Sequence, residues 1–410
     1  MDALFSNSNC KRTAAMSLTL AVLLILSALG LNSQSLDAPF GKAERRHIPN
    51  PCQTMIKPAA GGILVWSPTG KQYLVNQPDA SGIYQIYVGT AGGNLACISC
   101  TQVSTGPAPN LHKMQPRWYP TGDWIVLAVE MSNFQPPALA TPQLILGWLQ
   151  SGIWCNIWIT KPDGSQWFQL SNFGQQQTAD GFTGVAFTSD GSTAVWAQII
   201  NSNFLEYLFG QWRLIQADFQ VNGGVPSFSN LRDITPAGAN WIEPGNFAPG
   251  SHSLLITSDI GLTDPQGMDQ FTLDIDTGDV VNLTNTPTIW DEHGIFSPDG
   301  QRIIWMSSYP YQNVPNSGTV LGLETEFMLM DRDGSHYTQL THFNTPGYPE
   351  SNPGGQKTVA AIAAWNLKAT AMSALNLIFP NYQTWSINFL GDCVDGPRPD
   401  ARNFPFSIRR

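Results

Sequence analysis

The stretch FSPDGQRIIW, which runs from Phe296 to Trp305, decides the fold because it returns along the chain with variations. Each copy has an aromatic residue, a tight turn built on Pro, Asp or Gly, and an alternating apolar run. This pattern is typical of a β-hairpin, and its recurrence predicts a repeat architecture. The other copies are WSPTGKQYLV from Trp66, WYPTGDWIVL from Trp118, FTSDGSTAVW from Phe187 and FAPGSHSLLI from Phe247.

A second hairpin phrase follows each first one. LMDRDGSHYTQLT from Leu329 is a clear copy, with Asp-Gly between two alternating runs. Further copies start at Ile86, Ile157 and Leu273, while in the third unit a longer loop, Val221 to Asn230, joins two runs. Two hairpins per unit predict a four-stranded antiparallel sheet, which is the blade of a β-propeller.

The pair FSPDGQRIIWMSS and FMLMDRDGSHYTQLT, from Phe296 and Phe327, resembles the WD-repeat-like Pro-Asp-Gly repeats of TolB-type propellers. The resemblance covers residues 50–393 and implies an all-β fold, a six-bladed propeller of four-stranded antiparallel blades. It also implies that partners dock at the mouth of the central channel, but it assigns a role to no residue. Propellers host many unrelated activities, so it leaves the function open.

The sixth blade is a degraded copy, AAIAAWNLKATAMSALNLIF from Ala360, with Trp365 in the aromatic position. Its Ala, Leu and Met residues also favour a helix, but a closed ring needs strands there. TWSINFL from Thr384 supplies a third strand. The segment Gln53 to Ile56 is expected to add the fourth, with NFPFSI near the C-terminus as the alternative.

Cysteines give two further expectations. Cys52 and Cys393 flank the two strands that would close the ring, so a disulfide between them would stabilise it by about 4–5 kcal/mol; the alternative is that both are free. Cys97 and Cys100 are expected to be packing residues, because side chains three apart on a strand point to opposite faces. A disulfide between them would need a bulge.

Residues 1–30 have the pattern of a signal peptide, with Lys11 and Arg12 before an apolar run and small residues at Ala28 and Gly30. An uncleaved signal anchor is the alternative. Residues 31–49 then form a linker and residues 394–410 a C-terminal tail. The propeller is therefore expected to be periplasmic or secreted, with no further membrane span.

The composition of the chain limits the classes of partner that it is expected to bind. Charged residues make up 12% of the chain and the net charge is −10, which argues against nucleic acid as a partner. An envelope protein or a polysaccharide is the expected partner. The six similar blades pack against one another without a second subunit, so a monomer is expected.

The connections between second and third strands, and between blades, are long on one rim of the predicted ring. Long loops on a rigid scaffold are where binding residues concentrate. Two apolar segments in them, Gln143 to Trp148 and Phe204 to Trp212, are expected to form a cover over the channel or a patch for a partner.

Polar residues that precede the innermost strands should converge on the channel mouth. They would suit a cation, a sugar or a basic peptide, although a wet channel mouth is polar in any case. No cofactor is expected, with a divalent cation as the alternative. The candidate ligand-binding residues are His112, Gln115, Asp180, Glu243, Asp291, Glu292, His293 and Glu350.

No nucleophile elbow, HExxH motif or phosphate-binding loop is present in the sequence. The sequence therefore favours a non-catalytic binding scaffold of the cell envelope, with its ligand on the long-loop face over the channel. The alternative is a carbohydrate-active lyase or hydrolase that works at the same mouth with Glu243, Asp291, Glu292 and His293.

Overall fold

The computed structural model describes residues 53–59, 63–90, 93–136, 140–174, 180–202, 206–264, 266–319, 322–352, 356–378 and 381–390. The predicted signal segment, linker and tail lie outside these residues, as do Cys52 and Cys393. Among the helices of the described part, none is long and apolar enough to cross a membrane.

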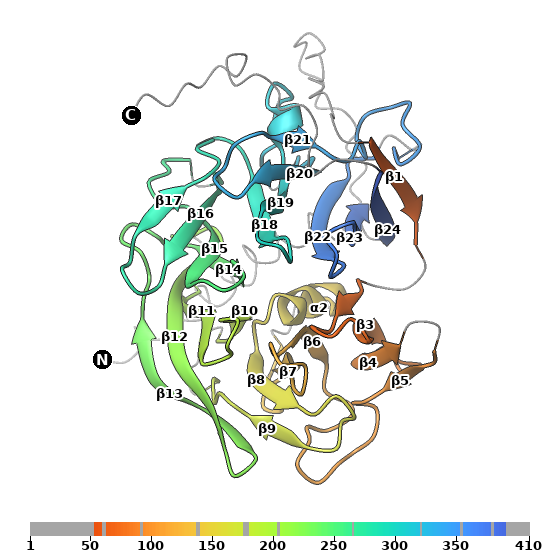
Figure 1. The fold of residues 1–410 in the computed structure, drawn as a ribbon, viewed down its shortest axis with the longest axis vertical. Helices are drawn as coiled ribbons and strands as arrows, with labels where there is room; N and C mark the ends of the chain where they lie inside the picture. Colours follow the sequence, from red (N-terminus) through yellow and green to blue (C-terminus); the bar gives the residue numbers. More distant parts are fainter. Residues whose placement is uncertain are drawn as a thin grey trace, which may run out of the picture.

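Six four-stranded antiparallel sheets stand around a central axis, which confirms the six-bladed propeller (Figure 1). Blade one contains β2 (Val65–Trp66), β3 (Gln72–Pro78), β4 (Tyr84–Thr90) and β5 (Leu95–Cys97), and blade two β6 (Lys113–Trp118), β7 (Ile125–Glu130), β8 (Cys155–Thr160) and β9 (Trp167–Gln169). Blade three contains β10 (Phe182–Phe187), β11 (Thr193–Asn201), β12 (Gln211–Asn222) and β13 (Val225–Asp233). Blade four contains β14 (Ile242–Phe247), β15 (Ser253–Ser258), β16 (Asp269–Asp274) and β17 (Val280–Asn282). Blade five contains β18 (Asp291–Phe296), β19 (Arg302–Ser307), β20 (Glu326–Asp331) and β21 (Thr338–Gln339).

Blade six closes the ring with a strand from the other end of the sequence. Its order is β22 (Val359–Trp365), β23 (Ala371–Ile378), β24 (Asn381–Leu390) and β1 (Gln53–Pro58). The strand interpretation of the Ala-rich stretch and the use of residues 53–56 are thus both confirmed. Strand β1 pairs antiparallel with β24, with Ile56 opposite Ile387, and Figure 1 shows the two side by side.

The repeated turns explain the glycines of the motif. The turn between the first two strands of a blade has a left-handed residue four positions after the aromatic in most blades, with φ of 67° at Gly70, 80° at Gly122 and 68° at Gly300. Glycine adopts this conformation without a steric penalty. In blade six, Ala369 stands in that place with φ 53°.

Apolar side chains fill the space between neighbouring blades. One cluster joins blades three and four through Val195, Leu214 and Phe271, and another joins blades five and six through Leu329, Trp365 and Trp385. The alternating strands point these residues to the blade faces, so stacking the blades buries them and holds the innermost strands in fixed places.

Blade three differs from the sequence-based expectation. Residues 221–230 do not form a long loop, because β12 and β13 continue to a tight turn at Gly223 and Gly224, which have φ of 58° and 84°. The two glycines supply the positive φ angles that a two-residue hairpin turn requires.

The prediction for the CxxC pair was wrong. Cys97 and Cys100 form a disulfide with their Cα atoms 5.7 Å apart. Strand β5 ends at Cys97, so Cys100 lies on the bend that follows and the opposite-face rule for strands no longer applies. Cys155 is the free, buried cysteine of the described residues.

Candidate ligand site at the channel mouth

The innermost strands share an irregularity that sets the direction of their side chains. The pairing register shifts within β6, β10, β14, β18 and β22. A bulge of this kind adds a residue to one strand and redirects its side chains. Three bulge residues have positive φ: Gln115 (50°), Gly184 (54°) and His293 (55°).

The bulge in β18 brings a histidine against two carboxylates. His293 Nε2 lies 3.5 Å from Glu243 Oε2, on the neighbouring β14, and 3.8 Å from Glu292 Oε1. One nitrogen or oxygen atom from each of the three residues falls within 4.8 Å of the others. We name these three residues the mouth cluster.

Neighbouring groups fix each member of the mouth cluster. His293 Nδ1 lies 2.9 Å from the carbonyl oxygen of Ala361, so this nitrogen carries a proton and donates. Glu292 Oε2 accepts from Trp290 Nε1 at 2.8 Å, and Glu243 Oε1 accepts from the Thr183 hydroxyl at 3.1 Å. The other atom of each side chain therefore faces the shared space.

Charge is balanced locally. Burial lowers the pKa of His293, but Glu292 and Glu243 outweigh it, and the net pKa lies above the ordinary value. Burial raises the pKa of Glu292, although His293 opposes this. Arg117 adds positive charge from β6, where its Nη1 donates to the carbonyl oxygen of Gly245 at 3.0 Å. The mouth cluster thus combines two acids and a base, and Arg117 places a positive charge near it.

Helix α2 (Pro142–Gln150) lies over the centre of the ring (Figure 1). Thr141 caps its N-terminus by accepting from the amide of Leu144, and Leu144, Trp148 and Leu149 are buried. At its other end, the carbonyl oxygen of Gln150 accepts from Gln115 Nε2 at 2.9 Å. This bond ties the helix to the bulge of β6, and so to the end of the channel where the innermost strands begin.

The two apolar segments pack against each other, although Phe204 and Leu205 of the second lie outside the described residues. Trp212 belongs to the same buried cluster as Leu144 and Trp148 of α2. Phe209 contacts Trp241 and Trp290 edge-on, with ring centroids 6.4 and 5.3 Å apart. Phe209 therefore packs on the tryptophan whose indole N–H is bonded to Glu292 of the mouth cluster, Trp290.

Two predicted residues stabilise loops instead of joining the mouth cluster. His112 Nδ1 accepts from the amide of Tyr84 at 3.2 Å, between blades one and two. Asp180 is buried and accepts from the amides of Gly174 and Gly181. Gln115 remains at the mouth, where its Oε1 accepts from the amide of Gly184 at 3.3 Å.

Asp291 and Glu350 are also turned away from the mouth cluster. Asp291 is buried between blades four and five, where it accepts from Trp305 Nε1 at 2.8 Å. Burial and the nearby Asp269 raise its pKa to about 7. Glu350 lies 3.2 Å from His342 Nδ1. His342 is buried and stacks on Tyr348, with the ring centroids 3.7 Å apart.

Sequence reasoning missed three residues that support the mouth cluster: Arg117, Thr183 and Ala361. Arg117 had one visible signal, because it is a charged residue in an innermost strand of a chain that is only 12% charged. Thr183 and Ala361 had none, since Ala361 acts through its backbone and Thr183 through contact with a different blade.

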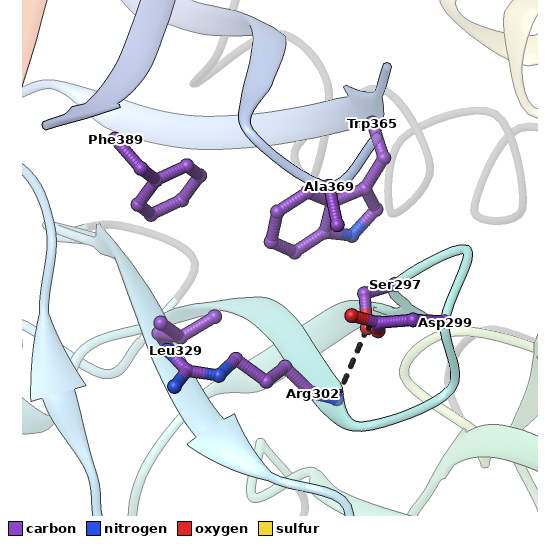
Figure 2. A pocket seen from close by; sticks show the side chains of 7 residues that line it. All are labelled: Ser297, Asp299, Arg302, Leu329, Trp365, Ala369 and Phe389. Atoms are coloured by element: carbon purple, nitrogen blue, oxygen red, sulfur yellow. Dashed lines mark hydrogen bonds between the residues drawn. The ribbon is translucent and has the colours of Figure 1, made fainter. Parts of the chain in front are cut away.

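A small hollow lies between blades five and six at the turn rim. Figure 2 shows the indole of Trp365 and the ring of Phe389 facing Arg302, with Asp299 at the turn of the blade-five hairpin. The volume of this hollow is about 20 Å³, which is room for about one water molecule. It is too small to hold a larger ligand.

No family model and no curated protein sequence matches this chain. Its fold is similar to that of TolB from Acinetobacter baumannii, at 14% identity and a TM-score of 0.44, over 78% of this chain and 64% of that one, which is just under two thirds of its length. It is also similar to a putative TolB from Agrobacterium tumefaciens (14%, TM-score 0.48, 80% and 90% covered) and to an oligogalacturonate lyase in complex with manganese (9%, 0.46, 82% and 91%). The strand topology itself defines the class as a six-bladed β-propeller, and these likenesses assign neither a family nor an activity.

Proposed function

We propose that this protein is a non-catalytic binding propeller of the cell envelope that takes its ligand or partner on the long-loop face over the central channel. One observation carries the proposal: Glu243, Glu292 and His293 come from two adjacent innermost strands and face the same space at the channel mouth. Convergent polar groups beside apolar walls are the usual form of a binding site. The wall here includes Trp241 and Trp290, which Phe209 contacts.

The two carboxylates that face the shared space favour a ligand with a cationic group. Glu243 and Glu292 present two carboxylate oxygens to the shared space, and the whole chain carries a net charge of −10. A basic segment of an envelope protein fits this chemistry. Export is part of the proposal, since the N-terminal sequence resembles a signal peptide and the Cys97–Cys100 disulfide suits an oxidising compartment.

Isothermal titration with hexalysine, hexa-arginine and neutral or acidic oligosaccharides tests the binding role. We expect a cationic probe to bind the wild type and to bind the Glu243→Gln/Glu292→Gln variant at least about tenfold more weakly. The matched control is His252→Ala, which changes an exposed His–Asp pair at the turn rim. Equal affinity of the cationic probes for all three proteins would contradict the proposal.

A carbohydrate lyase or hydrolase remains the second candidate because His293 lies near two carboxylates, as acid–base chemistry requires. Asp291 does not support it, since this side chain is buried away from the channel mouth. Incubating the same oligosaccharides with the protein distinguishes the two: shortened products from the wild type but not from Glu292→Gln would indicate an enzyme.

A further inference from the structure

We propose that Glu243, Glu292 and His293 chelate one divalent transition-metal ion, of the Mn²⁺ or Zn²⁺ type, at the mouth of the channel. The inference deepens the proposed function and rests on it, because the ion would occupy the place assigned to the cationic group. In this proposal the protein holds the metal ion, and an oxygen atom of the ligand binds to that ion.

The first argument is the geometry of the atoms that face one another. His293 Nε2 lies 3.5 Å from Glu243 Oε2 and 3.8 Å from Glu292 Oε1, and one ligand atom of each of the three residues lies within 4.8 Å of the others. Ligand atoms about 2.1 Å from a metal ion are separated by roughly 3–3.5 Å. A small rotation of each carboxylate about the oxygen that its neighbour holds therefore creates a coordination site without a change in the backbone.

The second argument is that groups outside the mouth cluster hold the opposite atom of each side chain. Trp290 Nε1 binds Glu292 Oε2, the Thr183 hydroxyl binds Glu243 Oε1, and the carbonyl oxygen of Ala361 accepts from His293 Nδ1. The last bond leaves Nε2 as the nitrogen that faces the two carboxylates. Metal-binding histidines are oriented in this way, with the second ring nitrogen donating to a carbonyl or carboxylate.

The third argument concerns which ion fits. Two carboxylates and one imidazole are a mixed oxygen and nitrogen set, which suits Mn²⁺ or Zn²⁺ better than Ca²⁺ or Mg²⁺, whose sites are built from oxygen. Three protein ligands leave at least one coordination position open. The side chains of His293, Glu243 and Glu292 are 30%, 19% and 13% exposed, so solvent reaches the site.

Mn²⁺ titration of the full chain, stripped of metal with a chelator, tests the proposal by calorimetry and by electron paramagnetic resonance of the free ion. We expect one ion per chain, with affinity reduced at least about tenfold in Glu292→Gln and in His293→Gln. The matched control, Asp276→Asn, removes the carboxylate of the exposed His252 pair and should bind Mn²⁺ as the wild type does. Zn²⁺ should compete with Mn²⁺ for the site, whereas Ca²⁺ should not.

A measurement on the unaltered protein covers the case in which a variant fails to fold. Bound Mn²⁺ should broaden the indole N–H signal of Trp290, whose Nε1 is bonded to Glu292, before that of Trp124, which lies in a different buried cluster. Absence of stoichiometric binding, or broadening of both signals together, would overturn the metal site. If hexalysine then still bound through Glu243 and Glu292, the proposed binding function would stand without the metal; if Mn²⁺ bound but neither peptides nor oligosaccharides did, the metal site would stand without that function.

Discussion

Ala369 shows how much a single backbone angle contributes in a repeated turn. It adopts φ 53° at the place where most of the other first hairpins have glycine, as at Gly122 with φ 80°. A left-handed conformation costs an L-residue roughly 1–2 kcal/mol, and glycine avoids this cost. Glycine also raises the conformational entropy of the unfolded chain, which cancels part of the gain in stability. We therefore expect Ala369→Gly to raise the free energy of unfolding by about 0.5–1 kcal/mol, measured by urea denaturation.

The reverse substitution in another blade is its control. A Cβ atom at Gly122 would meet only Pro68, at 3.6 Å, so Gly122→Ala changes mainly the backbone preference and should lower stability by about 1–2 kcal/mol. If both variants shifted stability in the same direction, the turn geometry would not be the cause.

Lys113 gives the protein a predictable response to alkaline pH. Its side chain is buried, its Nζ donates to the carbonyl oxygens of Ala108 and Pro109, and burial lowers its pKa from 10.5 to about 8 although Asp79 and Glu130 oppose this. Between pH 8 and 10.5 the unfolded chain binds more protons at this group than the folded chain does. Stability from this group therefore rises with pH across that window.

The comparison of wild type with Lys113→Met isolates this effect. The variant lacks the titrating amine, so the wild type should gain up to about 3 kcal/mol relative to it between pH 8 and 10.5. Denaturation at several pH values measures the difference. A constant difference across the window would show that Lys113 titrates normally in the folded protein.

At the scale of elements, α2 depends on its attachment to the channel wall. Gln115 donates to the carbonyl oxygen of Gln150 and accepts from the amide of Gly184. Gln115→Ala removes both bonds and should destabilise the protein by about 1–2 kcal/mol. We expect amide hydrogen exchange in α2 to quicken while exchange in β19 of the far blade stays the same.

A second variant at the other end of α2 serves as the comparison. Thr141→Ala removes the N-cap, and we expect it to cost about 1 kcal/mol and to quicken exchange mainly in the first turn of the helix. Unchanged exchange in α2 after Gln115→Ala would mean that buried contacts of Trp148 and Leu149 hold the helix by themselves.

The elements of the fold follow from the sequence more directly than the site does. Alternating runs around Pro, Asp and Gly turns predict each first hairpin, and the need for a closed ring predicts the use of β1. The helix α2 was not foreseen, because PQLILGWLQ has no acidic residue in its first turn and no basic residue in its last. The sequence offered two signals for the start of this helix: Thr141, which caps it, and Pro142, which is its first residue.

Bulges explain why only part of the mouth could be predicted. In a regular strand Asp291 and His293 share one face and Glu292 has the other. The register shift after Glu292 turns Glu292 and His293 towards the same space, while Asp291 remains between the blades. The bulge arises in the pairing of β18 with β19, so the sequence of the strand alone does not reveal it.

At the scale of the whole molecule, closure of the ring depends on the hydrogen bonds between β1 and β24. The amide of Ala59 donates to Thr384, so the alternation of an antiparallel pair places Met55 and Lys57 in hydrogen-bonded positions and points the amides of Thr54 and Ile56 outwards. Pro58, which has no amide hydrogen, stands in an outward position.

This register predicts a contrast between two proline variants. Met55→Pro removes a ladder bond and should lower the free energy of unfolding by about 2 kcal/mol or more, whereas Thr54→Pro should cost clearly less. Thermal and urea denaturation measure both. Equal losses would contradict the register, and no loss in either would contradict closure by β1.

Crystals soaked in MnCl₂ and measured at the manganese absorption edge test most directly whether the channel mouth is a cation site. We expect an anomalous difference peak about 2.0–2.4 Å from Glu243 Oε2, Glu292 Oε1 and His293 Nε2, and no such peak in Glu292→Gln crystals. A map with no peak among these three residues, or with peaks only at exposed carboxylates such as Asp276, would contradict the central claim.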